Sequence, residues 1–233
     1  MSNFKKNTFI YLSIFFVFVF ITFSFTQTNT LEKTQIKKGD TSITPIPRIG
    51  LDTVINVDGK TALFIGDSHT SNHKSGWQIL VSKETGMKMI NASVSGKTTY
   101  WMLEMAVYKI NDNINYCFVY GGANDMYTSS ITPDEAVNNI RSIARLCNKR
   151  GVKCVVLTGF DPIKCTRTPN PNYGKKYAKF QQLLLTEYME GAQVIDTRVI
   201  SRQDCWDGLC HMAPSGHRKI ANKVIQDLKL MKK

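Results

Sequence analysis

A serine, a glycine, an asparagine and an acid–histidine pair stand at the ends of short apolar runs in this sequence. They are Ser68, Gly96, Asn124, Asp207 and His211. A serine hydroxyl becomes a good nucleophile only when a base removes its proton, and a histidine oriented by an acid can be that base. Backbone N–H groups and an asparagine amide can stabilise the oxyanion that forms after attack on a carbonyl carbon. These residue types predict acyl-transfer chemistry that needs no metal ion and no organic cofactor.

The stretch LFIGDSHT at residues 63–70 allows two readings of Ser68. Serine is a preferred N-cap residue, so Ser68 could simply begin the next helix. Both readings place it at a turn between a buried strand and a helix. The order Ser68, Asp207, His211 matches one known order of convergent triads, although a Gly-x-Ser-x-Gly motif is absent. The role of Ser68 therefore depends on whether the fold brings the other residues to it.

Five short apolar runs predict the strands that would position these residues. They lie at residues 61–66, 87–93, 116–122, 152–159 and 192–196. Alternation of such runs with helical patterns is typical of a parallel sheet covered on both faces. Ligands bind beyond the carboxyl ends of the strands in these sheets, and that is where the candidate residues lie. We therefore expect them to converge at one sheet edge.

Helix signals occupy the intervals between the apolar runs. Thr132, Pro133 and Glu135 are suited to be the N-cap, the first helical residue and the capping-box partner of one helix. Gly151 is expected to end that helix. Further helices are expected after the first strand with Trp77, Leu80 and Val81 inward, over 99–110, over about 174–190 and from Pro214 onward. Asp125 is expected to shape its loop rather than to do chemistry.

The N-terminal residues predict a targeting segment. Residues 9–25 carry no charge and follow Lys5 and Lys6. This apolar core is long for a secretory signal and has a poor cleavage position, which favours an uncleaved signal anchor over a cleaved signal peptide. The expected divisions are a signal anchor or signal peptide at 1–25, a polar linker at 26–58 and a single domain at 59–233. We expect a single-pass membrane protein with an extracytoplasmic C-terminal domain, or a secreted one.

The chain carries 30 lysines and arginines against 18 acidic residues, a formal net charge of +12. Such a surface favours anionic surroundings such as acidic glycans or lipid head groups, or it reflects a solubility bias. No lysine or arginine run exceeds two residues, so no nucleic-acid partner is expected. His69 and His73 are four apart but lack an evident third ligand, so no metal site is expected. Cys205 and Cys210 could form a disulfide in an oxidising compartment, which their spacing leaves open.

The four sequence blocks resemble those of the SGNH (GDSL-type) hydrolase family. Gly-Asp-Ser at 66–68, Gly96, Gly-Ala-Asn-Asp at 122–125 and the pair Asp207 and His211 stand in the family's order. The resemblance implies Ser68 as nucleophile, His211 as base and Asp207 as acid. It implies an oxyanion hole made by the N–H groups of Ser68 and Gly96 and the side chain of Asn124. It also implies a flavodoxin-like three-layer α/β/α sandwich with a five-stranded parallel sheet, preceded here by an N-terminal apolar helix.

Three positions depart from the family's usual pattern. Asp207 lies four residues before His211 rather than three, which leaves open whether its carboxylate reaches the imidazole. The alternatives are a Ser68–His211 dyad with a backbone carbonyl orienting the ring, or Asp204 as the acid. The residue after Ser68 is a histidine instead of the leucine of the family name. Ser93 stands where the family often has a glycine.

The residues and the resemblance together predict a serine esterase that hydrolyses short-chain, mainly acetyl, esters through an acyl-enzyme. The expected substrate carries an ester, on a glycan or on a lipid. Two alternatives remain open from the sequence. One is an O-acyltransferase that uses the same residues and a sugar hydroxyl as acceptor. The other is an inactive surface-binding module that has kept the fold.

Overall fold

The computed structural model describes residues 54–71, 74–128, 130–160, 171–206 and 211–232. The predicted apolar segment 9–25, most of the predicted linker, His73, Asp207 and Cys210 lie outside these residues. Within the described residues, no helix combines the length and the apolar character that crossing a membrane requires.

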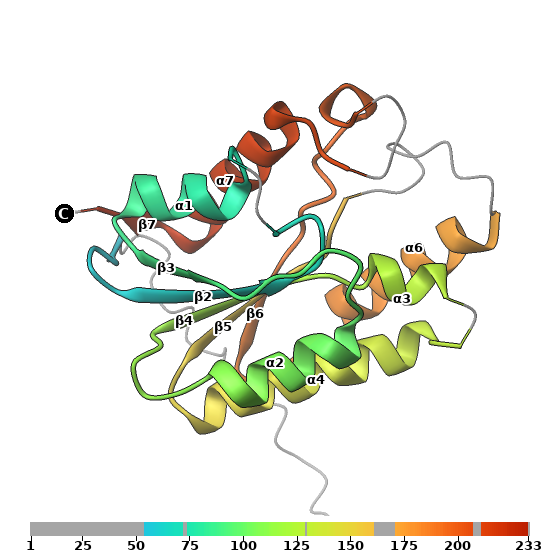
Figure 1. Cartoon of the computed structure of the whole chain (residues 1–233), viewed down its shortest axis with the longest axis horizontal. Helices are drawn as coiled ribbons and strands as arrows, with labels where there is room; N and C mark the ends of the chain where they lie inside the picture. The colour runs from blue at the N-terminus through green and yellow to red at the C-terminus, as the bar shows by residue number, and fades with distance from the viewer. Residues whose placement is uncertain (1–53, 72–73, 129, 161–170, 207–210, 233) are drawn as a thin grey trace, which may run out of the picture. The chain divides into compact units, whose positions relative to one another are not determined.

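Five parallel strands form the main sheet, and this confirms the predicted α/β class (Figure 1). They are β2 (Thr61–Gly66), β3 (Lys88–Asn91), β4 (Tyr116–Tyr120), β5 (Lys153–Leu157) and β6 (Ala192–Ile195). Their spatial order is β3-β2-β4-β5-β6. Numbered along the chain from β2, this is the 2-1-3-4-5 order of flavodoxin-like folds. The strand order reverses at β2, so the carboxyl end of β2 is where a ligand is expected.

Helices cover both faces of the sheet (Figure 1). On one face, α1 (Trp77–Thr85) packs against α7 (Pro214–Leu228). On the other face, α4 (Pro133–Lys149) packs between α2 (Thr99–Lys109) and α6 (Pro171–Thr186). A short helix, α3 (Ala123–Tyr127), follows β4 directly and was not predicted. The layers thus place the β2 and β4 strand ends between two sets of helices.

The central strands are apolar on both faces because both faces are covered. All five residues of β4 are buried, as are the last five of β2. Phe64 of β2 stacks on Phe118 of β4 with ring centroids 4.8 Å apart, and Trp77 of α1 meets Phe64 edge-on. Each such side chain contributes roughly 1.5–3 kcal/mol on burial. This packing holds the strand ends, and the loops that follow them, in fixed positions.

The capping signals of α4 act as predicted. The Thr132 hydroxyl accepts a hydrogen bond from the Glu135 N–H, and the Glu135 carboxylate accepts one from the Thr132 N–H. Pro133 is the first helical residue. Helix α4 ends at Lys149, and Gly151 follows with a positive φ of 67°, which a glycine adopts without strain. The side chains at the two ends of α4 therefore predicted where this helix begins and ends.

Two short strands fall where no strand was predicted. Strand β1 (Ile55–Asn56) pairs in parallel with β7 (Leu230–Met231) next to the end of α7. β1 lies inside residues 26–58, which were expected to be a linker, so the folded unit includes these two residues. A two-residue strand has no periodicity that the sequence could reveal.

Candidate active site

Ser68 lies in a tight turn after β2, at the carboxyl edge of the sheet. The carbonyl oxygen of Asp67 accepts hydrogen bonds from the N–H groups of Thr70 and Ser71, at 3.1 and 2.9 Å. Helix α1 begins only at Trp77, with Gly76 as its N-cap. The reading of Ser68 as the cap of the following helix is therefore wrong, and so is the expectation that the helix starts at that turn.

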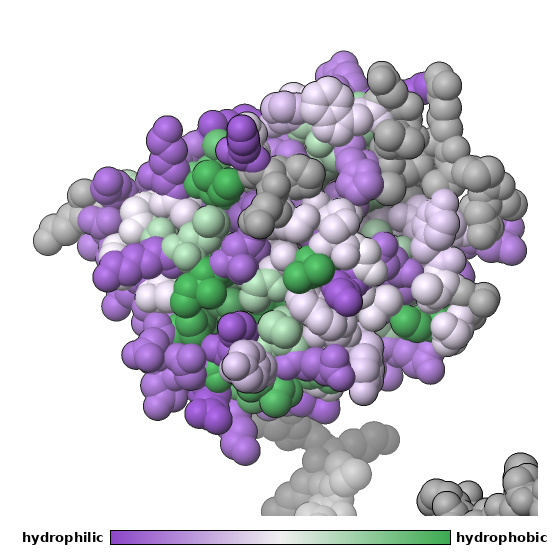
Figure 2. Space-filling view, viewed as in Figure 1, coloured by the Kyte–Doolittle hydropathy of each residue, from purple (hydrophilic) through white to green (hydrophobic). Residues whose placement is uncertain are grey.

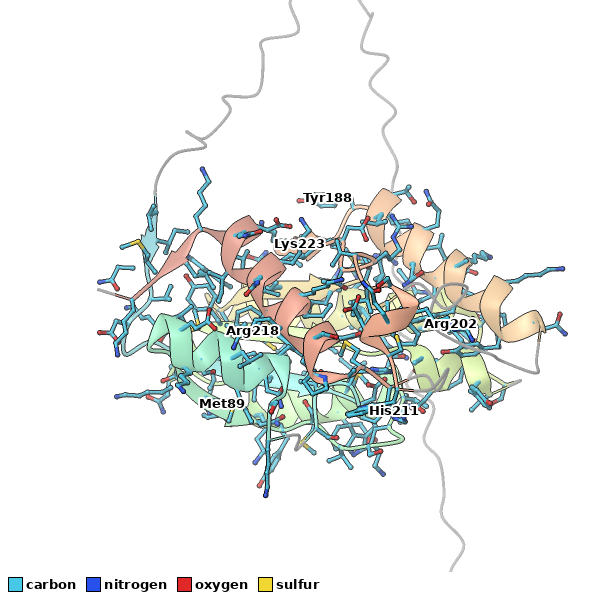
Figure 3. The ribbon with its side chains drawn as sticks, turned by 90° about the horizontal axis from the view of Figure 1, so that it is seen from above. Met89, Tyr188, Arg202, His211, Arg218 and Lys223 are labelled. Carbon is cyan, nitrogen blue, oxygen red and sulfur yellow. The ribbon has the colours of Figure 1, made fainter. Side chains whose placement is uncertain are left out.

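His211 approaches Ser68 from the segment before α7. Its Nε2 atom is 3.0 Å from the Ser68 Oγ atom, which is hydrogen-bonding distance. The backbone around His211 is held in two ways: its carbonyl oxygen accepts the Trp206 N–H at 3.0 Å, and Cys205 and Met212 form an antiparallel bridge. Figure 3 shows His211 beyond the N-terminal end of α7. The fold thus brings together two residues that are 143 positions apart.

Asp204 holds the His211 segment in place. Its carboxylate accepts hydrogen bonds from the Ser201 N–H and hydroxyl, at 2.9 and 2.7 Å, and from the Lys219 ammonium at 2.7 Å. Burial works to raise the pKa of Asp204, but these donors prevail and lower it to about 2. A carboxylate committed to Ser201 and Lys219 is a structural anchor, so the alternative role of Asp204 as the triad acid gains no support. Asp207 lies outside the described residues, and its role stays a prediction.

Asn124 reaches the site from the first turn of α3. Gly122 precedes it with a φ of 102°, and the Phe180 ring occupies the space that a Cβ on Gly122 would need. The Asn124 Nδ2 atom donates to the Lys97 carbonyl oxygen at 3.0 Å and lies 3.4 Å from Asp67 Oδ2. Asn124 therefore ties the loop that follows β3 to the end of β2.

Gly96 lies in that loop, next to Lys97. It is exposed and has a φ of 75°, and a Cβ built on it would meet nothing. Glycine is thus required here by the backbone conformation rather than by space. The loop is fixed to β2 by the Val94 N–H, which donates to the Gly66 carbonyl oxygen at 3.1 Å. The Ser93 hydroxyl adds a bond to the Phe64 carbonyl oxygen at 3.2 Å, which gives this departure from the family pattern a local role.

Asp125 shapes the same region from the buried side of α3, as expected. Its carboxylate accepts hydrogen bonds from both the N–H and the hydroxyl of Thr99, at the start of α2. Asn139 of α4 donates in turn to the Thr99 hydroxyl at 3.0 Å. Burial raises the pKa of Asp125, although the bonds from Thr99 oppose the shift. The partnership with Thr99 could not be read from the sequence, since the two residues are 26 positions apart.

Asp67, the residue before Ser68, is fully buried. Burial raises its pKa to about 7, and the nearby Asp125 carboxylate adds to the rise, while the hydrogen bond from the His69 N–H opposes it. This N–H lies 2.9 Å from Asp67 Oδ1. Asp67 therefore carries a carboxyl group that titrates near neutral pH, one residue from the candidate nucleophile.

His69 is the feature of the site that the sequence did not reveal. It is buried, with 2% of its surface exposed, and its ring lies 5.6 Å from that of His211 at an interplanar angle of 30°. It also stacks on Tyr120 at 5.5 Å and 16° and contacts Phe160 at 4.9 Å. His69 thus joins the ring of His211 to a buried aromatic cluster with Tyr120 and Phe160.

Comparisons with known proteins identify the family of the chain. Residues 64–219 match the GDSL-like Lipase/Acylhydrolase family, a match that spans more than half of the chain. The chain belongs to this family. The protein is accordingly an ester hydrolase of the GDSL-like type. No curated protein sequence matches the chain significantly.

Solved structures share the fold of this acylhydrolase at low sequence identity. An acetylxylan esterase from Geobacillus stearothermophilus is 16% identical, with a TM-score of 0.56, over 75% of this chain and 96% of that chain. A lipolytic protein of the G-D-S-L family from Veillonella parvula is 16% identical, with a TM-score of 0.58, over 72% and 97%. A GDSL-like lipase from Bacteroides thetaiotaomicron is 16% identical, with a TM-score of 0.58, over 73% and 88%.

Proposed function

We propose that this acylhydrolase is a serine esterase in which Ser68 attacks the ester carbonyl and forms an acyl-enzyme. The observation that carries the proposal is the distance of 3.0 Å between His211 Nε2 and Ser68 Oγ. At this distance the imidazole takes the hydroxyl proton as the oxygen attacks, and later gives it to the leaving alcohol. Water then enters with His211 again as base and releases the acid.

The oxyanion of the tetrahedral intermediate is proposed to lie between Ser68, Gly96 and Asn124. The Gly96 N–H makes no hydrogen bond within the described part of the chain, so it can donate to an incoming oxyanion. The Asn124–Asp67 contact is long, at 3.4 Å, whereas the Asn124–Lys97 bond is 3.0 Å. We infer that the Asn124 N–H nearer Asp67 turns to the oxyanion while the bond to Lys97 keeps the amide in place.

Asp207 is proposed to orient the His211 imidazole and to stabilise its charged form. The hydrogen bond between the Trp206 N–H and the His211 carbonyl oxygen supports this assignment, because Asp207 follows Trp206 directly in the chain. The loop is proposed to absorb the extra residue between Asp207 and His211. The ring of His69, which contacts that of His211 at a tilt of 30°, gives His211 a second source of orientation.

The substrate is proposed to be a short-chain, mainly acetyl, ester on a glycan. The net charge of +12 favours anionic polymers, and one protein of the same fold is an acetylxylan esterase. We further propose that residues 9–25 anchor the chain in a membrane with its C-terminal domain outside the cytoplasm. This rests on the uncharged run after Lys5 and Lys6.

Turnover of p-nitrophenyl acetate tests the proposed mechanism. The Ser68→Ala variant should lose roughly 10⁴-fold or more in kcat relative to the wild-type protein, as removal of a catalytic serine typically does. Ser142→Ala, in which the serine lost lies on α4 and bonds the Asn138 carbonyl oxygen, is the matched control and should retain activity. Equal rates in Ser68→Ala and wild type would reject Ser68 as the nucleophile.

A further inference from the structure

A hollow of about 170 Å³ opens beside the His211 segment. It is lined by Lys74, Ser75, Trp206, Met212, Pro214 and His217. Met212 is the next residue after His211, and the Trp206 N–H binds the His211 carbonyl oxygen at 3.0 Å. The hollow therefore begins one residue from the base of the proposed mechanism.

Two of the side chains at this hollow, those of Trp206 and Lys74, are exposed. Trp206 is 54% exposed, and within the described residues its indole makes no hydrogen bond and no ring contact. Lys74 is exposed and forms no ion pair with any described residue. Tryptophan is enriched where ligands or partners bind, and an exposed lysine beside it can pair with an anionic group of a ligand.

The position of the hollow decides which part of a substrate would reach it. In the tetrahedral intermediate, the oxyanion points toward its hydrogen-bond donors and the leaving oxygen points toward the base that protonates it. The proposed donors are Gly96 and Asn124, and the base is His211. The hollow adjoins His211 through Met212, the next residue in the chain. Because the leaving alcohol is the part of the ester that lies nearest to this base, the hollow suits the alcohol part of an ester better than the acyl chain.

We propose that this hollow is a subsite for the sugar that carries the ester, and that it binds an anionic oligosaccharide. The inference rests on the proposed function, because it takes His211 as the base. The indole face of Trp206 would pack on the apolar C–H face of a sugar ring, and Ser75 offers a hydroxyl for hydrogen bonding. Lys74 would pair with a carboxylate on the same or the neighbouring sugar.

The chemistry of the lining favours a sugar over a lipid chain. Trp206, Met212 and Pro214 are apolar, but Lys74, Ser75 and His217 are polar or charged. A site for a hydrocarbon chain would be a longer groove lined mainly by apolar side chains. A small concave site with polar groups around one aromatic face suits a ring that has both an apolar face and hydroxyl groups.

Binding measured on a protein without the nucleophile tests the subsite independently of catalysis. The full chain carrying Ser68→Ala would be titrated by calorimetry with a hexamer of galacturonic acid and, separately, with xylohexaose. Adding Trp206→Ala should raise the Kd for both by about tenfold or more, the size expected for an aromatic hot spot. Trp206→Phe should restore part of the loss. Lys74→Met should weaken binding of the galacturonate hexamer only, and added salt should abolish that difference.

Tyr188→Ala is the matched control, because Tyr188 is also an exposed aromatic residue, at 80%, and lies far from His211 (Figure 3). It should leave both Kd values as they are. An unchanged Kd in Trp206→Ala, or no binding of either oligosaccharide, would overturn the proposal. So would a loss of binding to phosphatidylglycerol vesicles without any effect on oligosaccharides, since that would make Trp206 a membrane contact. Failure of the proposed esterase mechanism would appear separately, as p-nitrophenyl acetate turnover that survives Ser68→Ala.

Discussion

Two buried aspartates lie on the two chain segments that carry Ser68 and His211, and their pKa values move in opposite directions. Asp204, which anchors the segment carrying His211, has a pKa lowered to about 2. Asp67, which lies beside Asn124, has a pKa raised to about 7. Both side chains are almost completely buried, at 2% and 0% exposure. Burial alone therefore does not determine the charge of a carboxyl group here.

The difference lies in the partners of the two carboxylates. Asp204 receives an ammonium from Lys219 together with two donors from Ser201. Asp67 receives one backbone N–H at 2.9 Å and a long contact from Asn124, and it has Asp125 as an acidic neighbour. Burial destabilises the charged form of a carboxyl group, and where no cation lies nearby its pKa rises. Asp204, on the His211 segment (the histidine side), is thus ionised at neutral pH. The protonation of Asp67, beside Asn124 (the proposed oxyanion side), changes around neutral pH.

The largest expected effect is on the oxyanion side, in the Asp67→Asn variant. The folded-state pKa of Asp67 is above its unfolded value of 3.8, so between about pH 4 and pH 7 the folded protein keeps a proton that the unfolded chain has lost. As the pH rises through that range, the free energy of unfolding of the wild type should therefore fall relative to that of Asp67→Asn, by about 1.4 kcal/mol for each pH unit. Urea unfolding at several pH values measures this difference. Parallel pH profiles for the two proteins would contradict it.

A smaller effect of opposite pH dependence is expected on the histidine side, in Asp204→Asn. This change removes the charged partner of Lys219 and should lower the free energy of unfolding at pH 7 by about 1.5–3 kcal/mol. Because the folded-state pKa is depressed, the stabilisation is present above about pH 4 and is lost as the pH falls through about 2. The difference between wild type and variant should therefore shrink on acidification.

An exposed ion pair provides the control for that prediction. Arg218 of α7 pairs with Glu84 of α1, and both side chains are nearly half exposed. Arg218→Ala should cost about 1 kcal/mol or less in the same urea experiment. A cost for Asp204→Asn no larger than this would show that the Lys219 partnership does not anchor the segment.

The smallest expected effect concerns His69, which supports His211 without touching the substrate. Loss of its aromatic contact with His211 in His69→Leu should lower kcat for p-nitrophenyl acetate about three- to tenfold, the equivalent of one aromatic pair, with KM little changed. His69→Phe retains a flat ring and should recover most of the rate. If the leucine and phenylalanine variants are equally active, the ring contact does not position His211.

The edge of the sheet differs from the polar segments at the strand ends, because it exposes apolar side chains. Strand β3 is an edge strand, and Met89 and Ile90 are each 41% exposed. Figure 2 shows apolar surface interspersed with polar groups on the face that it presents. The apolar run at 87–93 predicted a strand but not its place in the sheet. The edge position of β3 follows from the strand order instead.

The sequence predicted most of the strands and the side-chain signals that begin and end a helix. Five strands and the α4 capping box followed from apolar runs and from Thr132 and Glu135. The convergence of Ser68, Gly96 and Asn124 at one edge followed from the parallel sheet, since each residue lies in the segment after the carboxyl end of a strand. The start of α1 at Trp77 was not predicted, although residues 67–76 are rich in the serine, threonine, asparagine and glycine that are typical of loops.

The partnerships across the site were beyond sequence reasoning. The ring contact between His69 and His211 and the bonds from Thr99 to Asp125 join residues far apart in the chain. Only tertiary packing brings these residues together, so no local spacing signals them. The same holds for the opposite pKa shifts of Asp67 and Asp204, because each depends on a neighbour from another element.

The central claim is that Ser68 carries the acyl group, and trapping that intermediate tests it most directly. Protein mixed with p-nitrophenyl acetate and quenched in acid before steady state would be digested and analysed by mass spectrometry. The account predicts an acetyl group on the peptide containing Ser68 in the wild type, and none on it in His211→Ala, where the base is missing. Turnover with no acetyl on that peptide, or acetyl confined to a lysine or cysteine elsewhere, would contradict the account.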